Sequence, residues 1–231
     1  NWIRSSIPRY ASRVQHLQDL LTLALREAGP GKHAARRIQL DDVGWDATHD
    51  AAFTAINNAV ANSVRLAYPR DDKVLCVFTD ASDTHWAGVV TQVDPSELSK
   101  TVLEQSHEPL AFVSGAFAGS QLKWPTIEKE AFGILETCLR TEHILKRSGG
   151  FNLYTDHNNL KYIFSQDPEY FDGRRQAAQR VERWTVILRA FQYTIRHIPD
   201  FLVFAFEFND PFFQMIHSVV TDHINFNIPG F

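Results

Sequence analysis

The sequence predicts an α/β fold, with five strands in one mixed sheet, flanking helices and a small helical segment in front. Before Tyr68 the apolar residues recur at helical spacing. After Asp72 short runs of β-branched and aromatic residues alternate with further helical patterns. The elements follow one another as three strands, a helix, a strand, two helices and a last strand. This order is neither a repeat nor a series of βαβ units, so it favours a mixed sheet.

Two helices are expected in the first 68 residues. Their apolar positions, three or four residues apart, are Val14, Leu17, Leu21 and Ala24, and then Phe53, Ile56, Val60 and Val64. This spacing predicts amphipathic helices over residues 12–28 and 47–64, joined by a polar loop over 29–44.

The strands and remaining helices are predicted from residue type and spacing. Strands are expected near residues 73–80, 86–93, 110–114, 151–155 and 191–195. Helices are expected from residue 124, over 157–164, and around 177–188.

Composition and charge narrow the classes of function. The formal net charge of −4 argues against nucleic-acid binding by bulk electrostatics. No apolar run reaches the roughly twenty residues that span a bilayer, so no membrane partner is expected. Cys76 and Cys138 lie in apolar surroundings without metal-ligand spacing, which favours buried thiols in a reducing compartment. An intracellular protein, cytoplasmic or nuclear, is therefore expected.

Carboxylates stand at the ends of the predicted elements. Asp80 ends the first strand, Asp156 ends the fourth, and Glu128 and Glu130 lie in the first turns of the helix that follows Trp124-Pro125. Singly, each has an ordinary structural explanation as a turn residue, a cap or a complement to the helix dipole. Together they form an oxygen ligand set that suits Mg²⁺ or Mn²⁺. Two such ions about 4 Å apart can promote phosphodiester hydrolysis.

Five blocks of sequence carry a family resemblance. In order they are TDAS followed by WAGVV, EPLAFVSGAF, KWPTIEKEAFGIL, NLYTDHNNLKYIF and RVERWTVILRAFQYTIRHIP. Over residues 69–199 this set resembles the RNase H domain of gypsy-type LTR retrotransposon reverse transcriptases. The resemblance implies an RNase H-like five-stranded mixed sheet whose first three strands are antiparallel. It also implies a magnesium-dependent endonuclease that cuts the RNA strand of an RNA–DNA hybrid.

The same resemblance implies a set of site residues. Asp80, Glu130 and Asp156 would bind two Mg²⁺ ions, with Mn²⁺ as an alternative. Residues two apart on a helix differ by about 200°, so Glu128 and Glu130 cannot both face the metals. The family motif selects Glu130 and leaves Glu128 as a solvated or capping neighbour. His197 lies where related domains have a histidine that assists product release or proton transfer, and a structural role at a strand end is an equal alternative.

The fourth metal ligand of the family falls in an atypical region. Glu207 stands at the expected separation from His197, inside a Phe-rich run, and Asp210 is a candidate three residues later. A vacant fourth position is the other alternative. Residues 200–231 are expected to form a divergent or poorly ordered tail.

Residues 1–68 resemble the segment that joins the polymerase thumb to RNase H. The Tyr-x-Asp-Asp motif of the polymerase is absent, so no polymerase activity is expected. The expected partners are an RNA–DNA hybrid and the fingers–palm portion of the same polyprotein. Two other functions stay open: a catalytically impaired remnant that only binds nucleic acid or protein, and a structural subunit that docks onto a separate polymerase chain.

Overall fold

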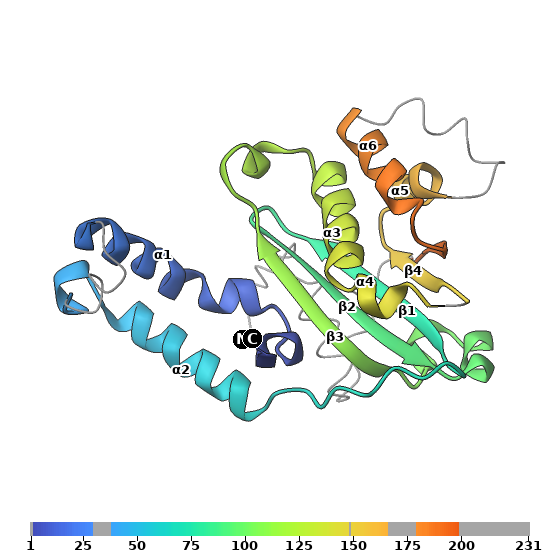
Figure 1. The fold of residues 1–231 in the computed structure, drawn as a ribbon, viewed down its shortest axis with the longest axis horizontal. Helices are drawn as coiled ribbons and strands as arrows, with labels where there is room; N and C mark the ends of the chain where they lie inside the picture. The colour runs from blue at the N-terminus through green and yellow to red at the C-terminus, as the bar shows by residue number, and fades with distance from the viewer. Residues whose placement is uncertain (1, 30–37, 148, 166–178, 199–231) are drawn as a thin grey trace, which may run out of the picture.

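The computed structural model describes residues 2–29, 38–147, 149–165 and 179–198. These residues form one five-stranded sheet, helices packed on it, and a helical arm at one edge (Figure 1). The strands are β1 (Val74–Ala81), β2 (His85–Val93), β3 (Glu108–Ala116), β4 (Phe151–Thr155) and β5 (Tyr193–His197). The α-helices are α1 (Tyr10–Ala28), α2 (Ala47–Ala61), α3 (Thr126–Arg140), α4 (Glu142–Leu145), α5 (Asn158–Phe164) and α6 (Gln179–Leu188).

The sheet is mixed, as the order of the elements predicts. Its strands lie in the order β3-β2-β1-β4-β5. β1 pairs antiparallel with β2, and β2 pairs antiparallel with β3. β4 lies parallel to β1, and β5 lies parallel to β4. The carboxyl ends of β1, β4 and β5 therefore meet at one edge of the sheet.

Helices α3 to α6 cover one face of the sheet and form the main core with it (Figure 1). Ile134 and Cys138 of α3 are fully buried against Val77 and Val90 in this core. α3 also lies very close to β2, because a Cβ atom added to Gly88 would lie only 2.9 Å from the Cβ of Thr137. Only glycine fits at this crossing.

The opposite face carries a smaller apolar cluster. Phe78 and Tyr154 stack there with ring centroids 4.7 Å apart. Side chains from the segment before β1 and from two short 3₁₀ helices, η4 (Pro95–Ser99) and η5 (Val102–Glu104), pack against this cluster. Both cysteines are buried free thiols, as predicted, and burial raises the pKa of each to about 12. No helix in the described ranges is long and apolar enough to cross a bilayer.

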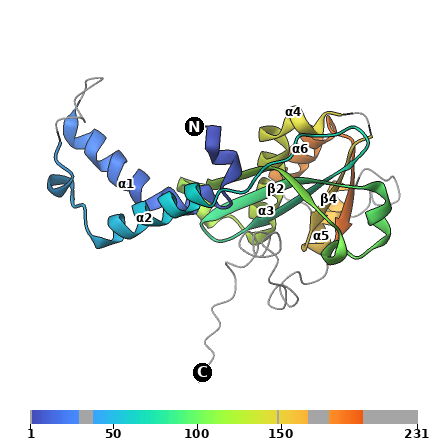
Figure 2. The same cartoon turned by 90° about the horizontal axis from the view of Figure 1, so that it is seen from below.

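The N-terminal elements form an arm that docks on the edge strand β3. The 3₁₀ helix η1 (Trp2–Ser6) and the start of α1 lie against this strand, and α1 and α2 extend away from the sheet side by side (Figure 2). Ser114 of β3 is the anchor: its hydroxyl accepts a 3.0 Å hydrogen bond from the Ala11 amide, and its carbonyl accepts one from Arg4. The Ala67 amide donates to the Pro109 carbonyl at 2.8 Å and ties down the end of the arm.

Three expectations about this arm need correction. The apolar stripe predicted for the second helix is not a buried face, because Phe53 is 53% exposed and α2 has no buried residue. In α1, Leu21 is likewise exposed and Leu20 takes its place in the core. The expected loop contains a short 3₁₀ helix, η3 (Asp41–Val43), whose Val43 packs under α1.

Candidate active site

The two predicted aspartates lie near the carboxyl ends of the neighbouring strands β1 and β4. In the parallel pair β1–β4, Phe78 lies opposite Tyr154. Asp80 and Asp156 each stand two residues further along, and side chains two residues apart in a strand share a face. Asp80, the last but one residue of β1, is buried, while Asp156 lies exposed just after β4. The site therefore opens to solvent on the Asp156 side.

Glu130 reaches this edge from α3. Its side chain is buried, and its Oε1 accepts a 3.1 Å hydrogen bond from the Ala81 amide, directly after Asp80. Its other oxygen, Oε2, is buried without a hydrogen-bond partner in the described part of the chain. Burial raises the pKa of Glu130 well above its ordinary value, and the negative charges of Asp80 and Asp156 raise it further. The three predicted ligands are thus near enough to repel one another.

Asp80 lies just before a turn that is held by hydrogen bonds. The turn between β1 and β2 is closed by Ser82, whose amide donates to the His85 carbonyl at 2.8 Å and whose hydroxyl accepts from the His85 amide at 3.0 Å. Trp86, the first residue after His85, is buried behind the turn. The Ser82–His85 hydrogen bonds therefore hold the turn from within, and the Glu130 bond to the Ala81 amide holds its first residue to α3.

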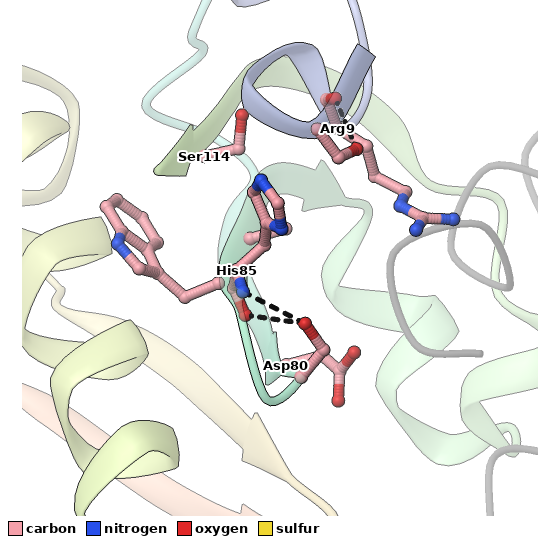
Figure 3. Close-up of a pocket in the computed structure, with 8 residues that line it drawn as sticks. Arg9, Asp80, His85 and Ser114 are labelled. Atoms are coloured by element: carbon pink, nitrogen blue, oxygen red, sulfur yellow. Dashed lines mark hydrogen bonds between the residues drawn. The ribbon is translucent and has the colours of Figure 1, made fainter. Parts of the chain in front are cut away.

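A small cavity of about 10 Å³ lies beside Asp80, roughly the room of one water molecule. Figure 3 shows Asp80 from β1, His85 from β2, Ser114 from β3 and Arg9, the residue before α1, around it. Asp80 pairs with Ala87, and Ala87 pairs with Ser114, so these three residues form one row across the sheet. At the β3 end of this row, the Ala11 amide at the start of α1 donates to the Ser114 hydroxyl.

The environment of Glu128 differs from the prediction. Glu128 is not a solvated neighbour: it is buried, and its Oε2 accepts a hydrogen bond from Arg180 of α6. The Arg180 guanidinium also lies over the Trp124 ring, 4.4 Å from its centroid. The two glutamates therefore face different ways, as their spacing requires, and Glu128 joins α3 to α6.

His197 lies next to Asp156. β5 ends at His197, which pairs with Thr155, and its Nε2 donates to the Asp156 carbonyl at 2.9 Å. This bond joins the end of β5 to the residue that follows β4, and it places His197 next to the predicted ligand Asp156. Glu207, Asp210 and the whole Phe-rich tail lie outside the described residues.

Sequence reasoning missed Lys129. This lysine lies between the two glutamates and is 4% exposed, and its ammonium group binds Asp83 in the β1–β2 turn. Helical spacing was the available signal, because Lys129 shares a stripe with Gly133 and Thr137, the residues of α3 that meet β1 and β2.

The residues present fit a magnesium site. The donor set is made of carboxylate oxygens, which Mg²⁺ and Mn²⁺ prefer, and Glu130 Oε2 is a buried acceptor without a donor. As they stand, no three His, Cys, Asp or Glu side chains in the described ranges are gathered closely enough to form a complete metal-binding group. The role of Asp80, Glu130 and Asp156 as metal ligands therefore stays a prediction, and the candidates for the fourth ligand, Glu207 and Asp210, lie outside the described residues.

Comparison with known proteins agrees with this geometry. A family model described as the RNase H-like domain found in reverse transcriptase matches residues 70–191, more than half of the chain. The chain belongs to this family. The chain is similar to the enzymatic polyprotein of carnation etched ring virus, with 23% identity over 155 residues. A Pol polyprotein from the Drosophila melanogaster transposon opus is 23% identical over 154 residues.

This RNase H-like chain spans only part of its relatives. The two alignments cover 67% of the chain, but 21% of the viral polyprotein and 14% of the opus polyprotein. Among solved structures, a foamy viral protease-reverse transcriptase in complex with double-stranded DNA has a TM-score of 0.59 at 16% identity, covering 86% of this chain and 30% of that one. The same kind of enzyme in complex with an RNA/DNA hybrid has a TM-score of 0.55 at 17% identity, covering 87% and 24%. These structures confirm the RNase H-like fold.

Proposed function

We propose that this chain is a magnesium-dependent ribonuclease that cleaves the RNA strand of RNA–DNA hybrids as part of a retroelement reverse transcriptase. The family supports a nuclease in that setting. The observation that carries the proposal is the position of three carboxylates near the carboxyl ends of β1 and β4: Glu130 accepts from the Ala81 amide beside Asp80, burial raises the pKa of Glu130, and the charges of Asp80 and Asp156 raise it further. A group of like charges in a rigid, half-open site is costly unless cations offset it.

Each carboxylate has a separate role in this mechanism. Asp80, held rigidly at the end of β1, and Asp156, at the open side, would bind metal ions from two neighbouring strands. Glu130 would complete the set from α3, with its position held by the Ala81 amide. Two bound Mg²⁺ ions would activate the attacking water and stabilise the leaving oxygen of the phosphodiester. Glu207 remains the proposed fourth ligand, with Asp210 or a vacant position as alternatives.

His197 is proposed to act at the rim of this site. Its ring lies against the backbone of Asp156, so it is close enough to the exposed carboxylate to assist proton transfer or product release. The structural bond to the Asp156 carbonyl uses Nε2 and leaves Nδ1 on the other side of the ring.

Hybrid cleavage tests the proposal directly. The purified chain with Mg²⁺ should cut an end-labelled RNA strand paired with DNA and leave the same RNA alone intact. Asp80→Asn keeps the size of the side chain but removes one ligand charge, so cleavage should fall by at least about 10³-fold. Glu182→Gln on the exposed face of α6 is the matched control and should cleave normally.

One result would favour the impaired remnant instead. A folded wild-type chain that binds the hybrid in a salt-dependent way, but leaves it intact with both Mg²⁺ and Mn²⁺, would be a binding module and not a nuclease.

The proposed setting is a longer polyprotein. We infer that the element is a retrotransposon of the gypsy type from the sequence blocks, while the relatives also include plant viruses. We further infer that the α1–α2 arm packs against the fingers–palm portion of the same polyprotein. Large apolar side chains on the arm are exposed, among them Leu21, Leu25 and Phe53.

A further inference from the structure

We infer that Lys129 is a positioning residue for the metal site: it fastens the β1–β2 turn to α3 and so sets the distance between Asp80 and Glu130. This inference rests on the proposed function of the site. In the sequence, only its helical spacing with Gly133 and Thr137 distinguishes Lys129 from an ordinary surface lysine. Its contacts and burial carry the argument.

The Lys129 side chain is buried, which is unusual for a lysine. Its Nζ donates to the backbone carbonyl of Asp83 at 2.8 Å and to the Asp83 carboxylate at 3.1 Å. The ammonium group also lies 5.8 Å from the centroid of the Phe117 ring. A buried cation is costly without such partners, so these contacts define where the turn lies on α3.

Two consecutive residues of α3 therefore hold the same turn. Glu130 accepts from the Ala81 amide at the start of the turn, and Lys129 binds Asp83 two residues later. Asp80 immediately precedes Ala81, so a shift of this segment relative to α3 also moves Asp80 relative to Glu130. If the Lys129 contact is lost, the Glu130 bond to the Ala81 amide stays, but the contact of Asp83 with α3 is gone.

Direct contact between Lys129 and the substrate does not fit this geometry. The side chain is 5% exposed, and its ammonium group points to Asp83, whose own side chain is 90% exposed. Lys129 thus acts through the turn. In metal sites, partners that orient the ligands typically change metal affinity 10- to 100-fold when they are removed.

Calorimetric titration of Mg²⁺ into the full chain tests this role without relying on activity. Lys129→Met keeps most of the aliphatic stem and removes the charge, so Mg²⁺ affinity should fall by about 10- to 100-fold. Asp83→Ala keeps the backbone acceptor and should lower affinity by no more than about fivefold. Lys123→Met, an exposed lysine just before α3, should bind Mg²⁺ like the wild type.

Asp83→Lys is the second variant in case Lys129→Met does not fold. The substitution is at an exposed side chain and places a like charge against Lys129, so the turn should be pushed off α3 while the core stays intact. Mg²⁺ affinity should then fall about as far as in Lys129→Met. Amide hydrogen exchange in residues 81–85 should become faster in both variants, while β3 stays as protected as in the wild type.

The outcomes separate this inference from the proposed function. If wild type binds Mg²⁺ and both Lys129→Met and Asp83→Lys bind it equally well, the positioning role is overturned and the nuclease proposal stands. If Lys129→Met loses hybrid affinity in EDTA instead, Lys129 contacts nucleic acid and the inference is also overturned. If wild type binds no Mg²⁺, the metal mechanism fails, and the inference fails with it.

Discussion

The surroundings of Glu130 differ from those of an ordinary buried polar residue. It is buried beside two aspartates, with one oxygen bound to the Ala81 amide and the other without a partner in the described part of the chain. Both burial and repulsion disfavour its charged form and raise its pKa. Such an arrangement lowers stability, which is a common cost of a functional site.

The raised pKa of Glu130 predicts how stability depends on pH. A carboxyl group whose pKa is higher in the folded state contributes most at low pH, where it is protonated in both states. That contribution is lost as pH rises from the ordinary value of about 4.5 through the raised pKa. In EDTA at pH 8, Glu130→Gln should therefore raise the free energy of unfolding by roughly 1–3 kcal/mol, and the gain should shrink toward pH 4.

Denaturant unfolding at the two pH values measures this effect. Glu182→Gln, an exposed glutamate on α6, should change stability little at either pH. Added Mg²⁺ should stabilise the wild type and not Glu130→Gln. An equal or lower stability of Glu130→Gln at pH 8 would contradict the assignment of a strained carboxylate.

For single residues, the sequence predicted which side chains are candidate ligands better than it predicted which side chains are buried. Asp80, Asp156 and the pair Glu128 and Glu130 were singled out from their places at strand ends and a helix start, and the family resemblance then selected Glu130, which the structure places next to Asp80. The burial of Lys129 and Glu128 was not predicted, because it depends on which neighbours α3 meets on its two sides. Local spacing shows that their side chains point in different directions, but not what covers them.

Helix α3 is the element that assembles the site. Its stripe of Lys129, Gly133 and Thr137 lies on the β1–β2 hairpin, while Ile134 and Cys138 enter the main core. The crossing is close because β2 has glycine at position 88, directly below Thr137. The distance between α3 and the β1–β2 hairpin therefore depends on the Gly88–Thr137 contact as well as on the core.

Two glycine-to-alanine substitutions test the close approach. A Cβ at residue 88 would come within 2.9 Å of the Thr137 Cβ, so Gly88→Ala should destabilise the protein by roughly 3 kcal/mol or more. A Cβ at residue 133 meets its nearest atom at 3.6 Å, and alanine favours a helix, so Gly133→Ala should be neutral or stabilising by up to about 1 kcal/mol. Thermal unfolding of the two variants should move in opposite directions, and equal losses would contradict the described packing.

All five predicted strands are present in the sheet. The strand over 151–155 agrees with β4, while β1 and β5 lie one and two residues later than predicted, β2 starts one residue earlier, and β3 extends two residues further at each end. The last strand starts at Tyr193 and not at Phe191, because β4 begins at Phe151 and Phe151 pairs with Tyr193. A strand end is thus decided by its partner, which a local pattern does not contain. The short 3₁₀ helices lack any periodic signal.

At the scale of the whole molecule, the helical arm differs from the sheet domain. The sheet has buried side chains on both faces, while α1 and α2 expose large apolar residues, including Leu25 at 54% and Phe53 at 53%. The spacing of apolar residues in this part of the sequence predicted both helices correctly, but the apolar positions of α2 are not buried. A helix pattern shows that one face is apolar, but not whether this chain supplies the surface that covers it.

The proposed docking of the arm on the polymerase portion gives a binding prediction. Leu25→Glu combined with Phe53→Glu should leave the fold intact, because both side chains are exposed, but should weaken binding to a fingers–palm fragment by at least tenfold. Val186→Glu, at a residue of α6 that is 63% exposed, is the matched control and should bind normally. Sedimentation of the mixed chains measures the complex, and equal binding by the double variant would place the interface elsewhere.

The anchoring of the arm at Ser114 has a consequence for how this domain can be separated from its neighbours. The family match begins at residue 70, yet hydrogen bonds from Arg4, Ala11 and Ala67 reach across to β3. A fragment cut at residue 70 would retain every proposed ligand of the described region and would uncover an edge strand ready to pair with a second molecule. The arm is thus part of the packing of the sheet, although the family match does not include it, and we expect a fragment that keeps the arm to aggregate less than one cut at residue 70.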